Sequence, residues 1–265
     1  MSDDSSKTNQ GPAAPKLAEI AEAAGIGIER KIFITVFDTL VRPGRAAKAA
    51  FDRSDDHISQ LKLFAIAAGL FFSAGAFFGA PMTPTIETLT AGGDAAAAYT
   101  SITNQGADPA TVDAALSRWG GLLAWPITLI ASVVFIVVLK LVKPSMTWFG
   151  HVLVYVIATN AMTLVAIPLV AAAAVSLELY FTLQVATIIL FFVQMMRLGS
   201  SALGLGAVRL LVLFILMAVA VFPTLLISGL LQFAVIWGVL EAHGVSILEM
   251  MEAATAVSQS PTGDT

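Results

Sequence analysis

Residues 121–142 read GLLAWPITLIASVVFIVVLKLV, an apolar stretch whose only charged residue, Lys140, stands near its end. An α-helix rises about 1.5 Å per residue, so about 20 apolar residues cross the roughly 30 Å hydrocarbon layer of a bilayer. Trp119 and Trp125 lie at the start of the stretch, and Lys140 and Lys143 lie at its end. Because tryptophan favours membrane interfaces and lysine favours the cytoplasmic one, this stretch predicts a transmembrane helix.

Four further apolar blocks repeat this pattern, at about 61–80, 148–173, 179–196 and 208–240. Apolar residues make up 57% of the chain and charged residues 12%, whereas soluble proteins carry about 25% charged residues. The sequence therefore predicts an all-α fold: a polytopic membrane helix bundle of about five transmembrane helices within residues 61–240.

The last block, 208–240, is longer than a single span requires, because about 33 residues form a helix of roughly 50 Å. Either it is one tilted span kinked at Pro223, or it is two short spans that turn at residues 223–229. A turn inside lipid leaves backbone groups without hydrogen bonds unless other helices shield them. This favours the single span and leaves the second alternative open.

Residues 1–60 precede the first span. Residues 1–15 are polar and are expected to form a disordered tail, and the first span is expected to serve as an uncleaved insertion signal. Residues 16–60 alternate apolar and charged residues and predict amphipathic helices at the cytoplasmic interface. The sequence Arg42-Pro43-Gly44-Arg45 predicts a change of direction between two of them, because proline disfavours helical geometry at the preceding residue.

Cationic residues predict the orientation. With five spans, thirteen of the fourteen Lys and Arg residues fall on the side of the N-terminus, and only Arg118 falls on the other side. Lys and Arg near span ends remain cytoplasmic. We therefore expect a protein of the bacterial inner membrane with a cytoplasmic N-terminus, a periplasmic loop at 81–118 and an acidic periplasmic tail at 241–265. A six-span alternative would place that tail in the cytoplasm.

Four cations of the N-terminal segment are candidate contacts to anionic lipid headgroups: Arg42, Arg45, Lys48 and Arg53. A cation near an anionic membrane surface contributes about 1 kcal/mol. The same residues would also enforce the topology, and the two roles are compatible.

Two groups of residues are candidates for contacts between helices. Small residues in the first span, Gly69, Gly75 and Gly79, permit close packing of another helix. The amides of Asn160, Gln184 and Gln232 lie deep in the predicted spans, where such groups most often hydrogen-bond across helices, at about 0.6–2 kcal/mol each.

Several chemistries lack the residues they need. The chain has no cysteine, and it has no phosphate-binding glycine loop and no Gly-x-Ser-x-Gly nucleophile motif. Its three histidines, His57, His151 and His243, are far apart in sequence. We therefore expect no enzymatic activity, no metal or cofactor and no nucleic-acid partner.

The segment from Ile28 to Gly69 resembles an uncharacterised bacterial inner-membrane family with a Thr-Leu-x-x-Leu-x-x-Arg-Pro-Gly-Arg-like motif before a Leu-x-Leu-Phe helix entry. The matching residues here are Thr39-Leu40, Arg42-Pro43-Gly44-Arg45 and Leu61 to Phe64. The span order is also loosely similar to the five-span Yip1-like architecture. Many members of the first family begin with a Cys-x-x-Cys zinc ribbon, which this chain lacks. The resemblance implies an architecture and no reaction.

Three functions remain as hypotheses. The first is a non-enzymatic accessory or scaffold subunit that associates with membrane lipids, with other membrane proteins or with itself. The second is a transporter of a small solute or lipid, with a site between spans three, four and five near Asn160 and Gln184. A membrane enzyme acting on lipid is the weakest, because no nucleophile and base can be named.

Overall fold

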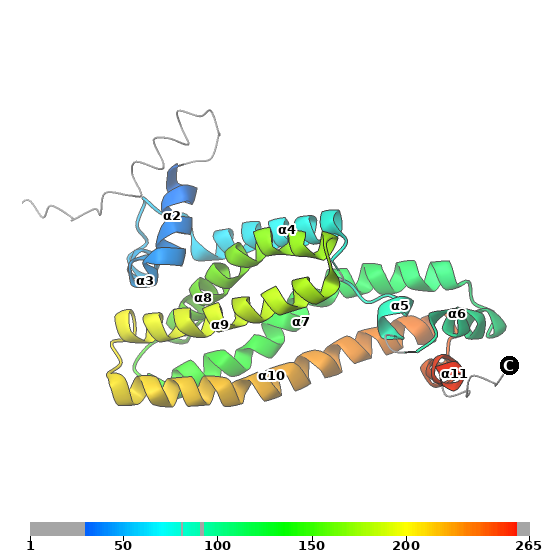
Figure 1. Ribbon diagram of the computed structural model, residues 1–265. Helices are drawn as coiled ribbons and strands as arrows, with labels where there is room; N and C mark the ends of the chain where they lie inside the picture. The colour runs from blue at the N-terminus through cyan, green and yellow to red at the C-terminus, as the bar shows by residue number, and fades with distance from the viewer. Residues whose placement is uncertain (1–29, 81, 91–92, 259–265) are drawn as a thin grey trace, which may run out of the picture. The chain divides into compact units, whose positions relative to one another are not determined.

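The computed structural model describes residues 30–80, 82–90 and 93–258, and the described parts fold into helices without strands. The predicted all-α class is therefore confirmed (Figure 1). The tail expected at 1–15, the first part of the amphipathic segment (16–29) and the end of the acidic tail (259–265) lie outside the described residues.

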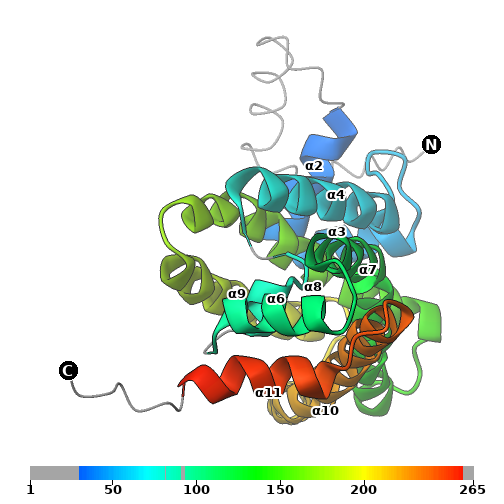
Figure 2. The same cartoon turned by 90° about the vertical axis from the view of Figure 1, so that its right-hand side faces the viewer.

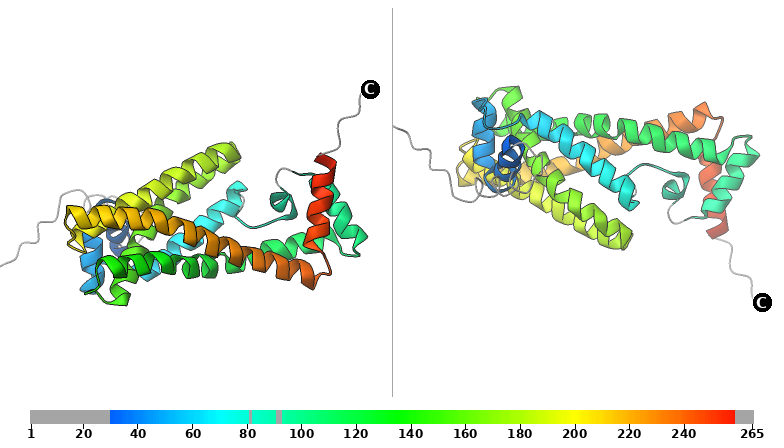
Figure 3. Two further views of the ribbon diagram at one scale, coloured as in Figure 1. Left: turned by 90° about the horizontal axis from the view of Figure 1, so that it is seen from below. Right: turned by 90° about the horizontal axis from the view of Figure 1, so that it is seen from above.

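Five helices are long and apolar enough to cross a membrane. They are α4 (Gln60–Phe78), α7 (Pro109–Val142), α8 (Trp148–Leu169) with the 3₁₀ turn η1 (Val170–Ala174), α9 (Leu177–Ser201) and α10 (Ala207–Ala242). The long helix α10 continues through Pro223 without a break. Figure 3 shows these helices from two further sides.

The chain divides into two compact units, and α4, α7 and α10 contribute residues to both. Unit 1 comprises residues 1–74 and 139–215, and unit 2 comprises residues 75–138 and 216–265. In unit 1, α8 is the most enclosed span, with buried residues along most of its length. Helix α9 packs along α8. Of the two short helices, α2 (Arg30–Val41) packs against α3 and α8, and α3 (Pro43–Phe51) packs against both α8 and α9.

Local sequence explains the ends of α3. Pro43 occupies the first turn, where its missing N–H is not needed and its fixed φ suits the helix. At the other end the Ser54 N–H donates to the Ala49 carbonyl at 2.9 Å, and Arg53 has a φ of 51°. This is the Schellman arrangement, in which glycine usually occupies the left-handed position. Here that position carries an arginine.

Unit 2 contains a helical cluster outside the long spans. Helices α5 (Ile86–Leu89), α6 (Ala95–Asn104) and α11 (Ile247–Ser258) pack with neighbouring turns of α7 and α10. Figure 2 shows α11 beside α6. The core of the cluster draws on sequence-distant segments and includes Ile86, Ile102, Leu116, Leu240 and Met250.

The structure adds detail to two segments that the sequence described only coarsely. Within the loop expected at 81–118 stand α5, α6 and the start of α7, which runs on from Pro109 into the span. Residues 247–258, in the expected acidic tail, form α11. Asp94 ties the two together, because its carboxylate caps α6 at the Ala96 N–H (2.8 Å) while its own N–H donates to the Ala254 carbonyl (2.8 Å).

Candidate functional site

A buried carboxylate organises the N-terminal part of unit 1. Asp38, on α2, has a side chain that is 1% exposed. Its Oδ2 lies 3.2 Å from Nε of Arg45 on α3 and 2.9 Å from Nε2 of His57, in the segment before α4. Because a buried charge is costly unless it is paired and hydrogen-bonded, these contacts compensate the carboxylate. They also join three consecutive segments of the chain at one oxygen atom.

Two threonines on the same face of α2 extend this network. The Thr35 hydroxyl donates to the Lys31 carbonyl (2.7 Å) and accepts from the Ile58 N–H (3.0 Å). The Thr39 hydroxyl accepts from the side-chain amide of Gln60 (3.2 Å), the first residue of α4. Helix α2 is thereby hydrogen-bonded to the start of a predicted span.

Asn160 connects the network to α8. Its side-chain amide donates to both the backbone carbonyl and the side-chain oxygen of Gln60, each at 2.9 Å, and both residues are buried. The other two amides predicted to bond between helices contact their own helices. The side-chain oxygen of Gln184 accepts from the Thr187 hydroxyl (3.5 Å), and the Gln232 amide donates to the Ser228 hydroxyl (3.4 Å).

Helix α9 holds the C-terminal end of α2. Gln194 donates to the Leu40 carbonyl at 2.8 Å, and the Arg197 guanidinium donates to the carbonyls of Leu40 and Val41. The last carbonyls of a helix lack intrahelical partners and carry partial negative charge, so a cationic donor suits them. In the sequence, Arg197 contributed only to the predicted membrane orientation. The residues next to it in the sequence do not indicate a contact with α2.

The four cations predicted to contact lipid differ in their surroundings. Arg45 is paired with Asp38, and Arg42 lies over the Phe37 ring, 5.4 Å from its centre. Lys48 is exposed on α3, and Arg53 follows that helix and lines a pocket. Only Lys48 and Arg53 are therefore candidates with no side-chain contact of this kind in the described structure.

The three glycines of the first span were predicted to permit close packing. A Cβ added at Gly69 or Gly79 would meet no described atom within 4 Å, and Gly79 has a φ of 69°, just past the end of α4. A Cβ at Gly75 would meet the side chain of Met82, which returns from the next segment. Gly44, which was not predicted to contact another helix, also makes a close contact, because an added Cβ would lie 2.6 Å from Cβ and Oγ of Ser201 on α9.

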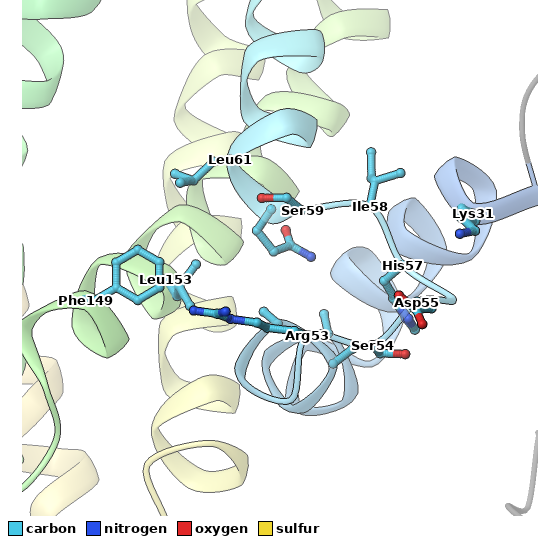
Figure 4. Close-up of a pocket in the computed structure, with 14 residues that line it drawn as sticks. Lys31, Arg53, Ser54, Asp55, His57, Ile58, Ser59, Leu61, Phe149 and Leu153 are labelled. Atoms are coloured by element: carbon cyan, nitrogen blue, oxygen red, sulfur yellow. The ribbon is translucent and has the colours of Figure 1, made fainter.

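The pocket beside this network has a volume of about 400 Å³. Its charged or titratable lining consists of Lys31, Arg53, Asp55 and His57. Its apolar lining includes Ile58, Leu61, Phe149 and Leu153, which come from the starts of α4 and α8 and the segment before α4. In Figure 4 the Arg53 side chain reaches toward Leu153 and Phe149, whereas His57, Asp55 and Ser54 gather on the other side.

His57 has one engaged and one unengaged ring nitrogen. Its side chain is 8% exposed, and Nε2 contacts Asp38. Its Nδ1 is buried and has no hydrogen-bond partner among the described residues. A neutral imidazole whose Nε2 carries the proton presents Nδ1 as an acceptor, and a protonated one presents it as a donor. The pocket thus combines two exposed cations, Lys31 and Arg53, with an apolar wall.

Part of this site had a signal in the sequence. Thr35, Asp38 and Thr39 stand at positions i, i+3 and i+4, which face the same way on a helix, and a polar stripe on an otherwise apolar segment indicates a buried network. The pairing of Asp38 with His57 had no such signal. Comparisons of the chain with protein-family models, with curated proteins and with solved structures gave no match.

Proposed function

We propose that this chain is a non-enzymatic accessory or scaffold protein of the bacterial inner membrane that associates with anionic lipids through α2 and α3. The observation that carries the proposal is the attachment of these two helices to the spans. Asp38, Gln60, Asn160 and Arg197 make buried or charge-assisted contacts that connect them to the start of α4, the middle of α8 and the end of α9. A segment held by these contacts presents a defined surface to its surroundings.

The exposed charges of this surface support an anionic partner. Five cations are exposed between residues 30 and 62, namely Arg30, Lys31, Lys48, Arg53 and Lys62. Three acids are exposed in the same range, namely Asp52, Asp55 and Asp56. The balance is positive, and each cation near an anionic bilayer surface contributes about 1 kcal/mol.

The proposed orientation has a cytoplasmic N-terminus and a periplasmic C-terminus. Cations near the ends of the apolar helices support it, because the segment before α4 and the α7–α8 and α9–α10 connections carry almost all of them. With this orientation, α2 and α3 lie on the cytoplasmic side, and the anionic lipids they meet are those of the inner leaflet.

Purification tests the proposal. The full-length protein would be extracted in a mild detergent, and co-purifying lipids and proteins identified by mass spectrometry. We expect enrichment of anionic phospholipid over its share of the membrane, reduced in the Lys48→Gln/Arg53→Gln double variant. Arg118→Gln removes one charge from unit 2 and serves as the control. If the protein elutes without enriched anionic lipid, the proposed lipid association is refuted. If a partner protein co-purifies and lipid does not, the function is scaffolding of proteins instead.

A further inference from the structure

We propose that α2 lies within the lipid leaflet at the starts of α4 and α8, parallel to the bilayer plane, with one apolar face against the acyl chains. This face, the outer face of α2, comprises Phe33, Phe37 and Leu40. The inference goes beyond the proposed contact with anionic headgroups, because it concerns hydrocarbon chains, and each of the two can hold without the other.

The burial pattern of α2 is the reverse of the pattern of a helix in water. Its buried residues are the polar ones Thr35, Asp38 and Thr39. All seven of its apolar residues are at least partly exposed: Ile32, Phe33, Ile34, Val36, Phe37, Leu40 and Val41. In a water-soluble protein the apolar stripe of a surface helix faces the core and its polar residues face solvent. The reversal indicates that the surroundings of α2 are apolar.

The polar and apolar residues occupy opposite sides of α2. At 3.6 residues per turn, Phe33, Phe37 and Leu40 share one side, and the three buried polar residues share the other. Each of these buried side chains has a hydrogen bond or an ion pair within the protein. Because lipid offers no such partners, a helix that enters it must satisfy its polar groups internally. Helix α2 meets this requirement.

The contact with α9 places α2 inside the length of the spans. Gln194, which donates to the Leu40 carbonyl, lies seven residues before the end of α9 at Ser201, about 10 Å along the helix. Helix α9 has 25 residues and is about 37 Å long, only roughly 7 Å more than the hydrocarbon layer. Even if the whole excess projects on this side, Gln194 remains within the hydrocarbon.

The contact with α8 gives the same result. Thr39 is hydrogen-bonded to Gln60, and Gln60 accepts from Asn160, which lies twelve residues, or about 18 Å, inside α8. The span formed by α8 and η1 has 27 residues and exceeds the hydrocarbon layer by only roughly 10 Å. Figure 1 shows α2 crossing the direction of α8 and α9. The helix therefore stays near one level, where its surface meets the same surroundings as the spans.

The cations at the two ends of α2 fit this position. Arg30 and Lys31 begin the helix and are exposed, and long cationic side chains reach the headgroups while their stems stay in apolar surroundings. Arg42 follows the other end and lies over the Phe37 ring, 5.4 Å from its centre. Such a contact is stronger where water is excluded.

Spin labels test which medium covers the outer face. Because the chain has no cysteine, single thiols can carry a nitroxide in the full-length protein, reconstituted in vesicles of phosphatidylcholine alone. Labels at Phe33→Cys and Leu40→Cys should collide with molecular oxygen in preference to a water-soluble nickel chelate, as at Leu70→Cys, exposed on α4. Their oxygen-to-nickel ratio should exceed that of Glu252→Cys, exposed on α11, by roughly tenfold or more, because polar solutes are excluded from hydrocarbon.

A second measurement leaves the sequence unchanged. The wild-type protein is irradiated in vesicles whose phosphatidylcholine carries a diazirine in its acyl chain, and crosslinked residues are located by mass spectrometry. We expect crosslinks within α2 as well as within α4. Crosslinks confined to the long helices would overturn the inference. So would preferential nickel collisions at both labels, which show that water covers the outer face, or low access to both reagents, which shows that protein covers it.

These outcomes are separable from those of the proposed function, because phosphatidylcholine has no net charge. If the labels report water or protein while the purified protein retains anionic lipid, α2 does not enter the leaflet and the proposed function stands. If the labels report acyl chains and the purified protein retains no anionic lipid, only the proposed function fails.

Discussion

Asp38 is a charged side chain held almost completely away from solvent, and its stability depends on the groups around it. Arg45, on α3, and His57, in the segment before α4, both contact its Oδ2 atom. Removing the charge of Asp38 leaves His57 buried without this partner, and removing His57 takes one of two partners from a buried carboxylate; such losses cost more than the interaction itself contributes.

The variant Asp38→Asn keeps the shape of the side chain and removes its charge. We expect it to lower the free energy of unfolding by about 2 kcal/mol, the loss typical of hydrogen bonds to a charged group. Thermal unfolding of the purified protein in detergent measures the change. Asp56→Asn, at an exposed position next to His57 in the segment before α4, should stay within about 0.5 kcal/mol of the wild type. Equal losses in the two variants would contradict the role given to Asp38.

Arg53 permits a prediction of opposite sign. Arg53→Gly should raise the free energy of unfolding by about 1 kcal/mol, because glycine adopts a φ of 51° without the steric cost of a side chain. Lys48→Gly is the matched control, since it removes a long cationic side chain from the interior of α3, the helix that Arg53 follows, and should lower stability by about 1 kcal/mol. The same unfolding measurement tests both. A loss of stability in Arg53→Gly would show that the side chain stabilises the fold more than the turn opposes it.

Single residues were the hardest part of the molecule to predict. The polar face of Thr35, Asp38 and Thr39 is visible as a helical pattern, but a pattern does not say whether solvent or protein covers it. The same limit applies to Asn160, whose place in a predicted span indicated an interhelical bond without naming Gln60 as its partner. That partner is 100 residues away in sequence, and only the packing of α8 against the start of α4 brings it near.

At the scale of elements, the contact between α3 and α9 depends on the absence of a side chain at Gly44. An added Cβ would lie 2.6 Å from both Cβ and Oγ of Ser201, closer than real Cβ atoms approach. Gly44 belongs to the turn Arg42-Pro43-Gly44-Arg45, in which Pro43 begins α3 and Arg45 reaches Asp38. One short sequence thus starts a helix, pairs a charge and permits a helix contact.

A double-mutant cycle tests this contact. Gly44→Ala should lower the free energy of unfolding by about 1–3 kcal/mol, as overpacking usually does. Ser201→Gly removes both colliding atoms, so the double variant should recover at least about 1 kcal/mol relative to the sum of the single changes. Gly206→Ala, where an added Cβ meets no described atom, serves as the control. Strict additivity of the two changes would exclude the contact.

Helices themselves were largely predictable, because apolar blocks of span length have few other structures available to them in lipid. The exceptions include α6 and α11. Neither has the length or hydropathy of a span, and their core residues Ile102 and Met250 pack together only because α7 and α10 bring distant segments to one place. A local pattern therefore did not reveal that these two segments fold as a pair.

For the whole molecule, charge follows the division into units. Unit 1 contains eleven of the described Lys and Arg residues: Arg30, Lys31, Arg42, Arg45, Lys48, Arg53, Lys62, Lys140, Lys143, Arg197 and Arg209. Unit 2 contains only Arg118 among its described cations, together with seven acids: Glu87, Asp94, Asp108, Asp113, Glu241, Glu249 and Glu252. The described parts of the loop and the tail belong to one compact unit, which supports the proposal that they lie on the same side of the membrane.

The pairing of α6 with α11 makes that placement testable. The Asp94 N–H donates to the Ala254 carbonyl at 2.8 Å, so both helices must lie on one side, whereas a sixth crossing would separate them. Because the chain has no cysteine, a single introduced thiol reports its own side. In intact spheroplasts, a membrane-impermeant maleimide should label Asn104→Cys and Glu252→Cys, and it should label Asp56→Cys only after permeabilisation; all three positions are exposed. Labelling of Glu252→Cys only after permeabilisation would show that α11 does not share a side with α6, and the five-span topology would be wrong.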